Sequence, residues 1–249
     1  MARPKEQSAQ AQIVAAARKH FGQDVARVSA PGGENRSSFR LHLTDRTVIA
    51  TLRPNFRRTH LEAHVLTELG RHCSDLPECL GVVGEIMFQS DVGKRRLNVE
   101  VAQVAPAVQL DLAGEAVSAI FRIHGAARQT ELNAIMPHLG NNRDWVLNFV
   151  DAVDFLKDRT AAYERINAPA RQFVKWDCRS GNAAIGRDDK LRWFDFEYAG
   201  LRHGAEDIAW LIGDEAWPVA PQDMVDVVID AFDPTCGILL PDYLDYLSV

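Results

Sequence analysis

Three polar residues in the second half of the chain have the types and spacing needed for chemistry at a phosphate group. Asp177 is followed five residues later by Asn182, and Asp195 comes directly after the largely apolar stretch 191–194. A carboxylate can orient a hydroxyl group and accept its proton, while carboxylate and amide oxygens are ligands that Mg²⁺ prefers. Because a lone Asp and Asn at this spacing also occur in ordinary turns, the surrounding segments decide whether the pattern carries chemistry.

Those surrounding segments resemble a known family, in the same order along the chain. The Asp177 loop followed by Asp195-Phe is similar to the catalytic and metal-binding segments of kinase-fold enzymes. The form Asp195-Phe-Glu-Tyr-Ala, followed by His203-Gly-Ala-Glu-Asp207, resembles the aminoglycoside phosphotransferase/choline kinase family rather than the protein kinases. The resemblance runs from about residue 28 to 215 and includes the nucleotide loop, the helix with an ion-pairing Glu, the strand entering the hinge and the helix with a buried His, at residues 32–40, 61–69, 97–102 and 120–124.

The resemblance implies an α+β fold of two lobes, protein-kinase-like, with a small antiparallel sheet in the N-terminal lobe and a larger helical C-terminal lobe. We expect residues 1–102 to form the first lobe and residues 103–249 to form the second, with the catalytic and metal-binding loops. The implied reaction is transfer of the γ-phosphoryl group of ATP to a hydroxyl of a small molecule, with Mg²⁺ as a further cofactor. The family's acceptors include aminoglycosides, choline or ethanolamine, sugars and related metabolites, and the sequence does not choose among them.

By the same resemblance, each matching residue takes a role in nucleotide binding or catalysis. Asp177 becomes the catalytic base, and Asn182 and Asp195 become the Mg²⁺ ligands. Glu62 becomes the partner of a phosphate-binding cation, and Asp207 the acceptor of backbone hydrogen bonds from the catalytic loop. The other implied nucleotide contacts, from the nucleotide loop and from the hinge, are Asn35, Ser37, Glu100 and Ala102.

Two positions depart from the family's pattern. Where the family usually shows His-Gly-Asp, this chain has Lys175-Trp176-Asp177, so we expect Lys175 to stabilise phosphate charge or to lower the pKa of the Asp. The usual phosphate-binding Lys is missing, and the matching position holds Thr51. Arg53 lies two residues further on, hence on the same face and about 6.6–7 Å along the strand. We therefore expect Arg53 to bind the phosphates, with Thr51 as the alternative.

The elements that must position these residues follow from hydrophobic periodicity. In the N-terminal part, the pattern predicts helices at 7–21 and 61–69, a hairpin at 39–43 and 47–52, and strands at 82–89 and 96–104. Helical patterns dominate from about residue 110, and they predict helices at 112–127, 145–166, 205–212 and 221–232. Short strands and loops are expected over residues 173–196, where the candidate catalytic residues lie.

Properties of the whole chain bound the class of protein. With 249 residues, 47% of them hydrophobic and 25% charged, the chain has an ordinary globular composition and enough length for its own core. A net charge of −6 argues against a nucleic-acid or membrane-surface partner and mildly favours a cationic acceptor. The four cysteines form no Cys-x-x-Cys pair, and no signal peptide or membrane-spanning run is visible, so we expect a cytoplasmic protein of unspecified oligomeric state.

Two other classes of function fit parts of the sequence. A kinase-like module that binds a nucleotide or regulates without catalysing would also account for the missing Lys and the altered His-Gly-Asp pattern. A metal hydrolase is suggested by His60 and His64, whose spacing places two imidazoles on one helix face, but no third ligand accompanies them. An ordinary, partly exposed helix explains this pair better. His124, on an apolar helical stripe, is expected to be a hydrogen-bonded core histidine.

Overall fold

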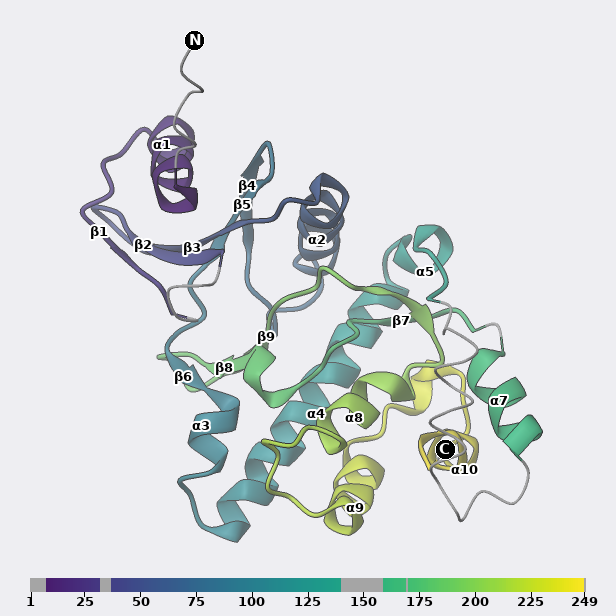
Figure 1. Cartoon of the computed structure of the whole chain (residues 1–249). Coiled ribbons are helices and arrows are strands. Elements are labelled where there is room, and N and C mark those ends of the chain that lie inside the picture. The colour runs from purple at the N-terminus through teal and green to yellow at the C-terminus, as the bar shows by residue number, and fades with distance from the viewer. Residues whose placement is uncertain (1–7, 32–36, 140–158, 169, 249) are drawn as a thin grey trace. The chain divides into compact units, whose positions relative to one another are not determined.

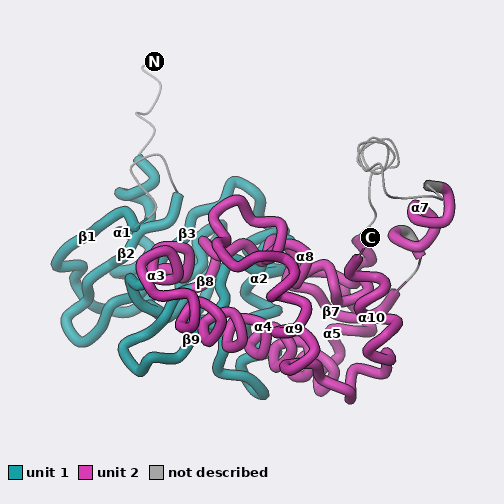
Figure 2. The backbone as a smooth tube through the Cα atoms, turned by 90° about the horizontal axis from the view of Figure 1, so that it is seen from below, with its two compact units in different colours: residues 1–95, 184–198 teal, residues 96–183, 199–249 magenta. Residues whose placement is uncertain are grey.

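The computed structural model describes residues 8–31, 37–139, 159–168 and 170–248 of the chain (Figure 1). The chain divides into two compact units, one made of residues 1–95 and 184–198 and the other of residues 96–183 and 199–249 (Figure 2). The sequence-based expectation was a single boundary at residue 102. The observed division instead assigns Asp195 to the first unit, whereas Asp177 and Asn182 belong to the second.

The first unit is built on a five-stranded antiparallel sheet in the order β1-β2-β3-β5-β4. Its strands are β1 Arg27–Ser29, β2 Ser38–His42, β3 Thr47–Leu52, β4 Cys79–Val83 and β5 Ile86–Ser90. The hairpin predicted at 39–52 is confirmed as β2 and β3, whose register pairs Ser38 with Thr51. The single strand predicted at 82–89 is wrong, because Gly84, with a φ of 62°, lies in a turn that folds this segment into the β4–β5 hairpin.

The two faces of this sheet differ in chemistry because side chains alternate along each strand. One face is apolar and packs against helix α1 (Ala9–Phe21), which confirms the helix predicted at 7–21. Their shared core contains Ile13, Ala17, Phe39, Leu41, Val48, Ala50, Ile86 and Phe88. The opposite face carries polar side chains, among them Arg40 and Thr51, and it is the face on which strand β3 leads into Arg53.

Two further elements complete the first unit. Helix α2 (Phe56–Leu69) carries Glu62 and begins five residues before the predicted helix start at 61, with Asn55 as its N-cap. Strands β8 (Ala183–Ile185) and β9 (Leu191–Trp193) form a hairpin in a small sheet with β6 (Arg95–Arg96). The backbone N–H of Trp193 donates to the carbonyl of Asp75 at 2.8 Å, which attaches this hairpin to the chain that follows α2.

The strand predicted at 96–104 is wrong, because the structure has the short helix α3 (Leu97–Val101) there. Leu97 and Val101 are both fully buried, and a four-residue spacing of buried side chains is typical of a helix rather than of an alternating strand. Glu100 therefore lies within α3, and Ala102 follows its last residue. A strand entering the hinge is not formed by this segment.

The second unit is mostly helical. Its helices are α4 (Pro106–Arg128), α5 (Leu132–Ile135), α7 (Arg159–Asn167), α8 (Ala205–Ile212), α9 (Pro221–Ala231) and α10 (Leu240–Leu247). The helices predicted at 112–127, 205–212 and 221–232 are confirmed, while α10 was not predicted. Residues 145–158 of the helix predicted at 145–166 lie outside the described residues. In a two-stranded sheet, β7 (Gln172–Val174) precedes the loop that carries Asp177, and β10 (Gly200–Arg202) precedes helix α8, which carries Asp207.

Candidate active site

The loop after β7 holds Asp177 in an unusual backbone conformation. Among the residues that the structure describes, only four non-glycine residues have positive φ, and they include Trp176 at 59°, Asp177 at 57° and Asp195 at 68°. Each such residue costs on the order of 1–3 kcal/mol and persists only where surrounding contacts over-determine the backbone. Strain in the described chain is therefore concentrated at residues that the sequence had singled out for chemistry.

Asp207, at the first turn of α8, supplies the contacts that hold this loop. Its Oδ2 accepts the backbone N–H of Lys175 at 2.7 Å, and its Oδ1 accepts the N–H of Trp176 at 2.8 Å. His124 of α4 lies with Nε2 2.9 Å from the same Oδ2, and both side chains are buried. The prediction that Asp207 accepts backbone hydrogen bonds from the catalytic loop is confirmed, and so is the prediction that His124 is a hydrogen-bonded core residue.

Lys175 is buried, with 1% of its surface exposed. Its Nζ donates to the backbone carbonyl of Asp177 at 3.1 Å and to that of Trp176 at 3.4 Å. The Lys175 ammonium group thus supports the positive-φ turn by donating to the carbonyl oxygens of Trp176 and Asp177. Asp207 accepts the backbone N–H groups of the same turn. A direct contact of Lys175 with a phosphate stays a prediction.

The carboxylate of Asp177 has two partners within its own loop. Arg179 donates from Nε to Oδ1 at 2.6 Å and from Nη2 to Oδ2 at 3.2 Å. Asn182, at the end of the short 3₁₀ turn 180–182, donates from Nδ2 to Oδ2 and to the backbone carbonyl of Asp177, both at 3.0 Å. Since its amide nitrogen makes these bonds, Asn182 has its amide oxygen as the group suited to a cation.

Two residues of this loop escaped the sequence-based prediction. Arg179 pairs with the candidate base, and 56% of its side chain is exposed, so it can turn toward a ligand. The signal for it was a cation two residues after Asp177. Asp214, just after α8, accepts the backbone N–H of Ser180 at 2.7 Å and also its hydroxyl. No local pattern pointed to Asp214, because it is 34 residues from its partner.

Aromatic side chains lie next to the candidate base. The rings of Trp176 and Trp210 meet edge to face with centroids 6.0 Å apart, and the guanidinium of Arg202 lies 5.9 Å from the Trp176 ring centroid. Arg202 is buried and is fixed by Glu206 and by the carbonyls of Leu139 and Ile166. The two Trp rings are only partly buried, so they offer apolar and π surface beside Asp177.

In the first unit, Arg53 is surrounded by carboxylates. Its Nη2 donates to Oε2 of Glu62 at 2.6 Å and to Oδ1 of Asp195 at 2.8 Å, and its Nη1 lies 3.5 Å from Oε1 of Glu197. The other oxygen of Glu62 accepts the backbone N–H of Phe196 at 3.0 Å, which attaches α2 to the segment that bears Asp195. The expected pairing of Glu62 with a cation is confirmed, and the cation is Arg53.

Thr51, the alternative to Arg53 for binding the phosphates, takes no part in this cluster of charged side chains. Its hydroxyl lies 3.0 Å from the hydroxyl of Ser38 across the β2–β3 pair, and it contributes no charge. Of the remaining predicted nucleotide contacts, Asn35 lies outside the described residues, and Ser37 is exposed just before β2. Glu100 and Ala102 belong to the second unit, at α3.

Two features make the Arg53 cluster a place for a charged ligand. The Nε–H of Arg53 is buried and has no hydrogen-bond partner among the residues that the structure describes. Three carboxylates, those of Glu62, Asp195 and Glu197, lie around this one guanidinium, and a second cation, Arg58, is 3.7 Å from Glu197. An orphan donor suits a phosphate oxygen, and the three carboxylates outnumber the two cations, Arg53 and Arg58.

Burial has a large effect on Glu62. It raises the pKa of this carboxyl to about 7, although the charge of Arg53 and the hydrogen bond from Phe196 act in the opposite direction. The ionised form of Glu62 is therefore stabilised by the charge of Arg53. Within the described parts of the chain, no three His, Cys, Asp or Glu side chains are grouped to hold a metal, and no helix is long and apolar enough to span a membrane.

Comparison with known proteins supports the same fold. In sequence, the chain matches no family model and no curated protein. In structure, it is similar to macrolide 2′-phosphotransferase MphH from Brachybacterium faecium, with a TM-score of 0.62 at 16% identity, over 95% of this chain and 87% of that one.

Two other solved structures are similar over most of their length. The aminoglycoside-3′-phosphotransferase of type VIII has a TM-score of 0.59 at 14% identity, over 97% of each chain. Choline kinase LicA from Streptococcus pneumoniae has a TM-score of 0.59 at 10% identity, over 96% of this chain and 86% of that one. Over nearly its whole length, the chain therefore has the kinase-like fold that these phosphotransferases and the choline kinase share.

Proposed function

We propose that the chain is an ATP- and Mg²⁺-dependent phosphotransferase that moves the γ-phosphoryl group to a hydroxyl of a small molecule. The observation that carries this proposal is the ion-paired cluster of Arg53 with Glu62 and Asp195. It occurs in a chain whose fold is similar to that of small-molecule phosphotransferases and a choline kinase.

The first unit supplies the groups that bind the nucleotide's phosphates. Glu62 orients Arg53, whose unpaired Nε–H is available to a phosphate oxygen. The polar sheet face beside Arg53, with Ser38 and Thr51, would receive the rest of the nucleotide. Asp195 and Asn182 each carry an oxygen donor of a type that Mg²⁺ prefers, and both are the proposed ligands of that ion. When bound, Mg²⁺ would neutralise charge on the β- and γ-phosphates.

The second unit supplies the groups that handle the acceptor. Asp177 orients the acceptor hydroxyl and takes its proton while the new O–P bond forms and the bond from the γ-phosphorus to the bridging oxygen of ADP breaks. Arg179, which pairs with Asp177 in the structure, would stabilise negative charge on the transferring group. Asp207 and Lys175 keep the loop in its strained shape, so that Asp177 is positioned before substrate arrives.

The acceptor belongs to the class of small hydroxyl compounds, and two observations favour an amine-bearing one. The Trp176 and Trp210 rings beside Asp177 offer π surface that attracts a cation. The chain is also acidic overall, at −6. Aminoglycosides and choline, which are named in the similar structures, both combine hydroxyl and amine groups, whereas sugars lack the charge.

The experiment is an ADP-release assay over amino alcohols, aminoglycosides, macrolides and sugars, with wild type and Asp177→Asn. Turnover is expected with at least one acceptor, and the variant should lose about 100-fold or more of it while it keeps ATP affinity. Asp226→Asn, an exposed substitution on α9, is the matched control and should leave turnover unchanged. If no acceptor supports turnover and ATP still raises the melting temperature, the chain is a nucleotide-binding module without catalysis, and the proposal fails.

A further inference from the structure

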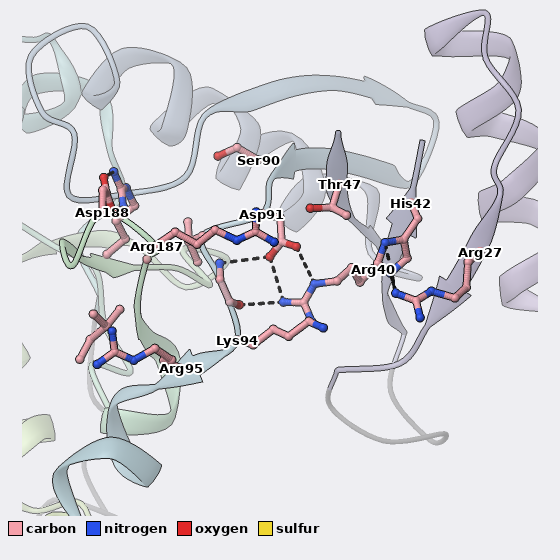
Figure 3. A pocket seen from close by; sticks show the side chains of 15 residues that line it. Arg27, Arg40, His42, Thr47, Ser90, Asp91, Lys94, Arg95, Arg187 and Asp188 are labelled. Carbon is pink, nitrogen blue, oxygen red and sulfur yellow. Dashed lines mark hydrogen bonds and ion pairs between the residues drawn. The ribbon is translucent and has the colours of Figure 1, made fainter. Parts of the chain in front are cut away.

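A cavity of about 790 Å³ lies wholly within the first unit (Figure 3). It is formed by the ends of β1, β2 and β3, by the chain that follows β5, and by the β8–β9 hairpin. Its volume is in the range of small-molecule sites, which is roughly 300–1,000 Å³. We call this cavity the basic pocket, after the side chains that line it: Arg27, Arg40, Lys94, Arg95, Arg187 and Arg192.

The charge of the basic pocket is opposite to that of the whole chain. Six arginine or lysine side chains and two aspartates line it, a formal balance of four positive charges in a chain of net charge −6. These cations come from segments up to 165 residues apart in sequence, from Arg27 to Arg192. Gathering like charges raises the free energy of the fold unless solvent or a ligand compensates them.

Both aspartates of the pocket are already committed to individual arginines. Asp91 accepts from Arg40 at 2.6 and 2.9 Å, and the same guanidinium donates to the carbonyl of Gly93 at 2.7 Å (Figure 3). Although burial acts to raise it, the hydrogen bonds and charge of Arg40 hold the pKa of Asp91 below its ordinary value. Asp188 is bound by Arg192 at 2.7 and 2.9 Å. The two carboxylates thus hold the guanidinium groups of Arg40 and Arg192 in place at the pocket.

The other cations of the pocket are less compensated. Arg95 pairs with Asp189, but no carboxylate among the described residues forms an ion pair with Arg27, Lys94 or Arg187. Lys94 and Arg187 are exposed at the opening, where they can close on a ligand. The positive charge of the pocket also acts on His42. Burial lowers the pKa of its imidazole, and the charges of Arg27, Lys94 and Arg40 lower it further.

The pocket is separate from the cluster that we assign to the nucleotide's phosphates. Thr47, at the pocket, is six residues before Arg53 on one extended strand, which corresponds to about 20 Å. A phosphate bound at Arg53 therefore does not satisfy the cations of the basic pocket.

We infer that the basic pocket binds a small molecule that carries two or more phosphate groups. Five of its six cations are arginines, whose planar forks bind phosphate oxygens in pairs, and the hydroxyl of Ser90 adds a neutral donor. The rigid Arg40 and Arg192 provide a preformed surface, and Lys94 and Arg187 complete it when the anion enters. This site is independent of the proposed phosphoryl transfer.

The test is isothermal titration calorimetry of the full chain with sodium tripolyphosphate, in EDTA so that no Mg²⁺ takes part. The double variant Lys94→Gln/Arg187→Gln is expected to bind at least tenfold more weakly than wild type. Arg71→Gln, an exposed arginine of the same unit outside the pocket, should bind within twofold of wild type. Arg53→Ala should also keep binding within twofold, which separates this site from the nucleotide cluster. If the double variant does not fold, as judged by circular dichroism, Arg27→Gln replaces it with the same expectation.

Several results would overturn the inference. Equal affinity of wild type and the double variant would show that the anion binds elsewhere. Loss of binding in Arg53→Ala would assign it to the nucleotide cluster. Citrate or a poly-glutamate peptide binding as tightly as tripolyphosphate would exclude a phosphate-specific site.

Discussion

The catalytic loop of the second unit and the Arg53 cluster of the first unit both depend on a buried carboxylate, but in different ways. Asp207 accepts backbone N–H groups and a buried His, so its partners are fixed parts of the fold. Glu62 is bound mainly to the side chain of Arg53, and burial works against its charge. The loop carrying the candidate base is therefore held by fixed backbone and core contacts, whereas Arg53 is held by side-chain ion pairs that a ligand can modify.

The largest expected effect concerns Asp207, which holds the loop that carries Asp177. Asp207→Ala leaves the N–H groups of Lys175 and Trp176 without their acceptor in a buried site, so the free energy of unfolding should fall by about 4 kcal/mol. Chemical denaturation measures this change. Asp226→Ala on the exposed side of α9 should stay within about 0.5 kcal/mol of wild type. Equal losses in the two variants would mean that Asp207 does not brace the loop.

The next effect concerns Glu62 in the Arg53 cluster, and it is measured as a dependence of stability on pH. Because the pKa of Glu62 is raised from 4.5 to about 7 in the folded state, its contribution to stability is fully present below pH 4.5 and is lost as the pH rises through 7. The free energy of unfolding should therefore fall over this range, by at most about 3 kcal/mol from this group. Urea denaturation at several pH values should show a smaller decline in Glu62→Gln. An unchanged slope in that variant would exclude Glu62 as its source.

A third effect concerns the ligand that the ion pair is proposed to serve. Arg53→Ala should weaken ATP binding at least tenfold, about 1.4 kcal/mol, because the unpaired Nε–H and the charge are both removed. Fluorescence titration with a labelled ATP analogue measures this change. Arg71→Ala, an exposed position just after α2, is the control and should bind as wild type. Unaltered ATP affinity in Arg53→Ala would show that Arg53 does not bind the phosphates.

The smallest expected effect sharpens the role of Arg179. Its pairing with Asp177 is largely exposed, so Arg179→Gln should change the free energy of unfolding by only a few tenths of a kcal/mol. If Arg179 instead stabilises the transferring phosphoryl group, turnover in the ADP-release assay should fall by much more than this small change in stability. A variant that loses stability but keeps turnover would make Arg179 merely a structural partner of the base.

Local patterns predicted the candidate site better than they predicted some elements around it. Arg53 was reached by strand parity alone, since residues two apart share a face, and the structure pairs it with Glu62 as expected. The segment 97–101 was misread as a strand, because Leu97, Val99 and Val101 alternate with polar residues as in a half-buried strand, although Val99 is exposed in the helix that forms. The β4–β5 turn was also missed, although Gly84 and Glu85 interrupt the apolar residues on either side of it.

The sequence by itself singled out Asp177, Asn182 and Asp195 as the candidates for phosphoryl-transfer chemistry, through their short spacings and the strand between them. Only the tertiary structure decided which residues support them and where charge accumulates. Asp214 meets Ser180 across 34 residues of chain, and the cations of the basic pocket come from segments up to 165 residues apart. Such contacts depend on how elements pack and which strand ends converge, and these are properties of the whole fold that no local spacing records.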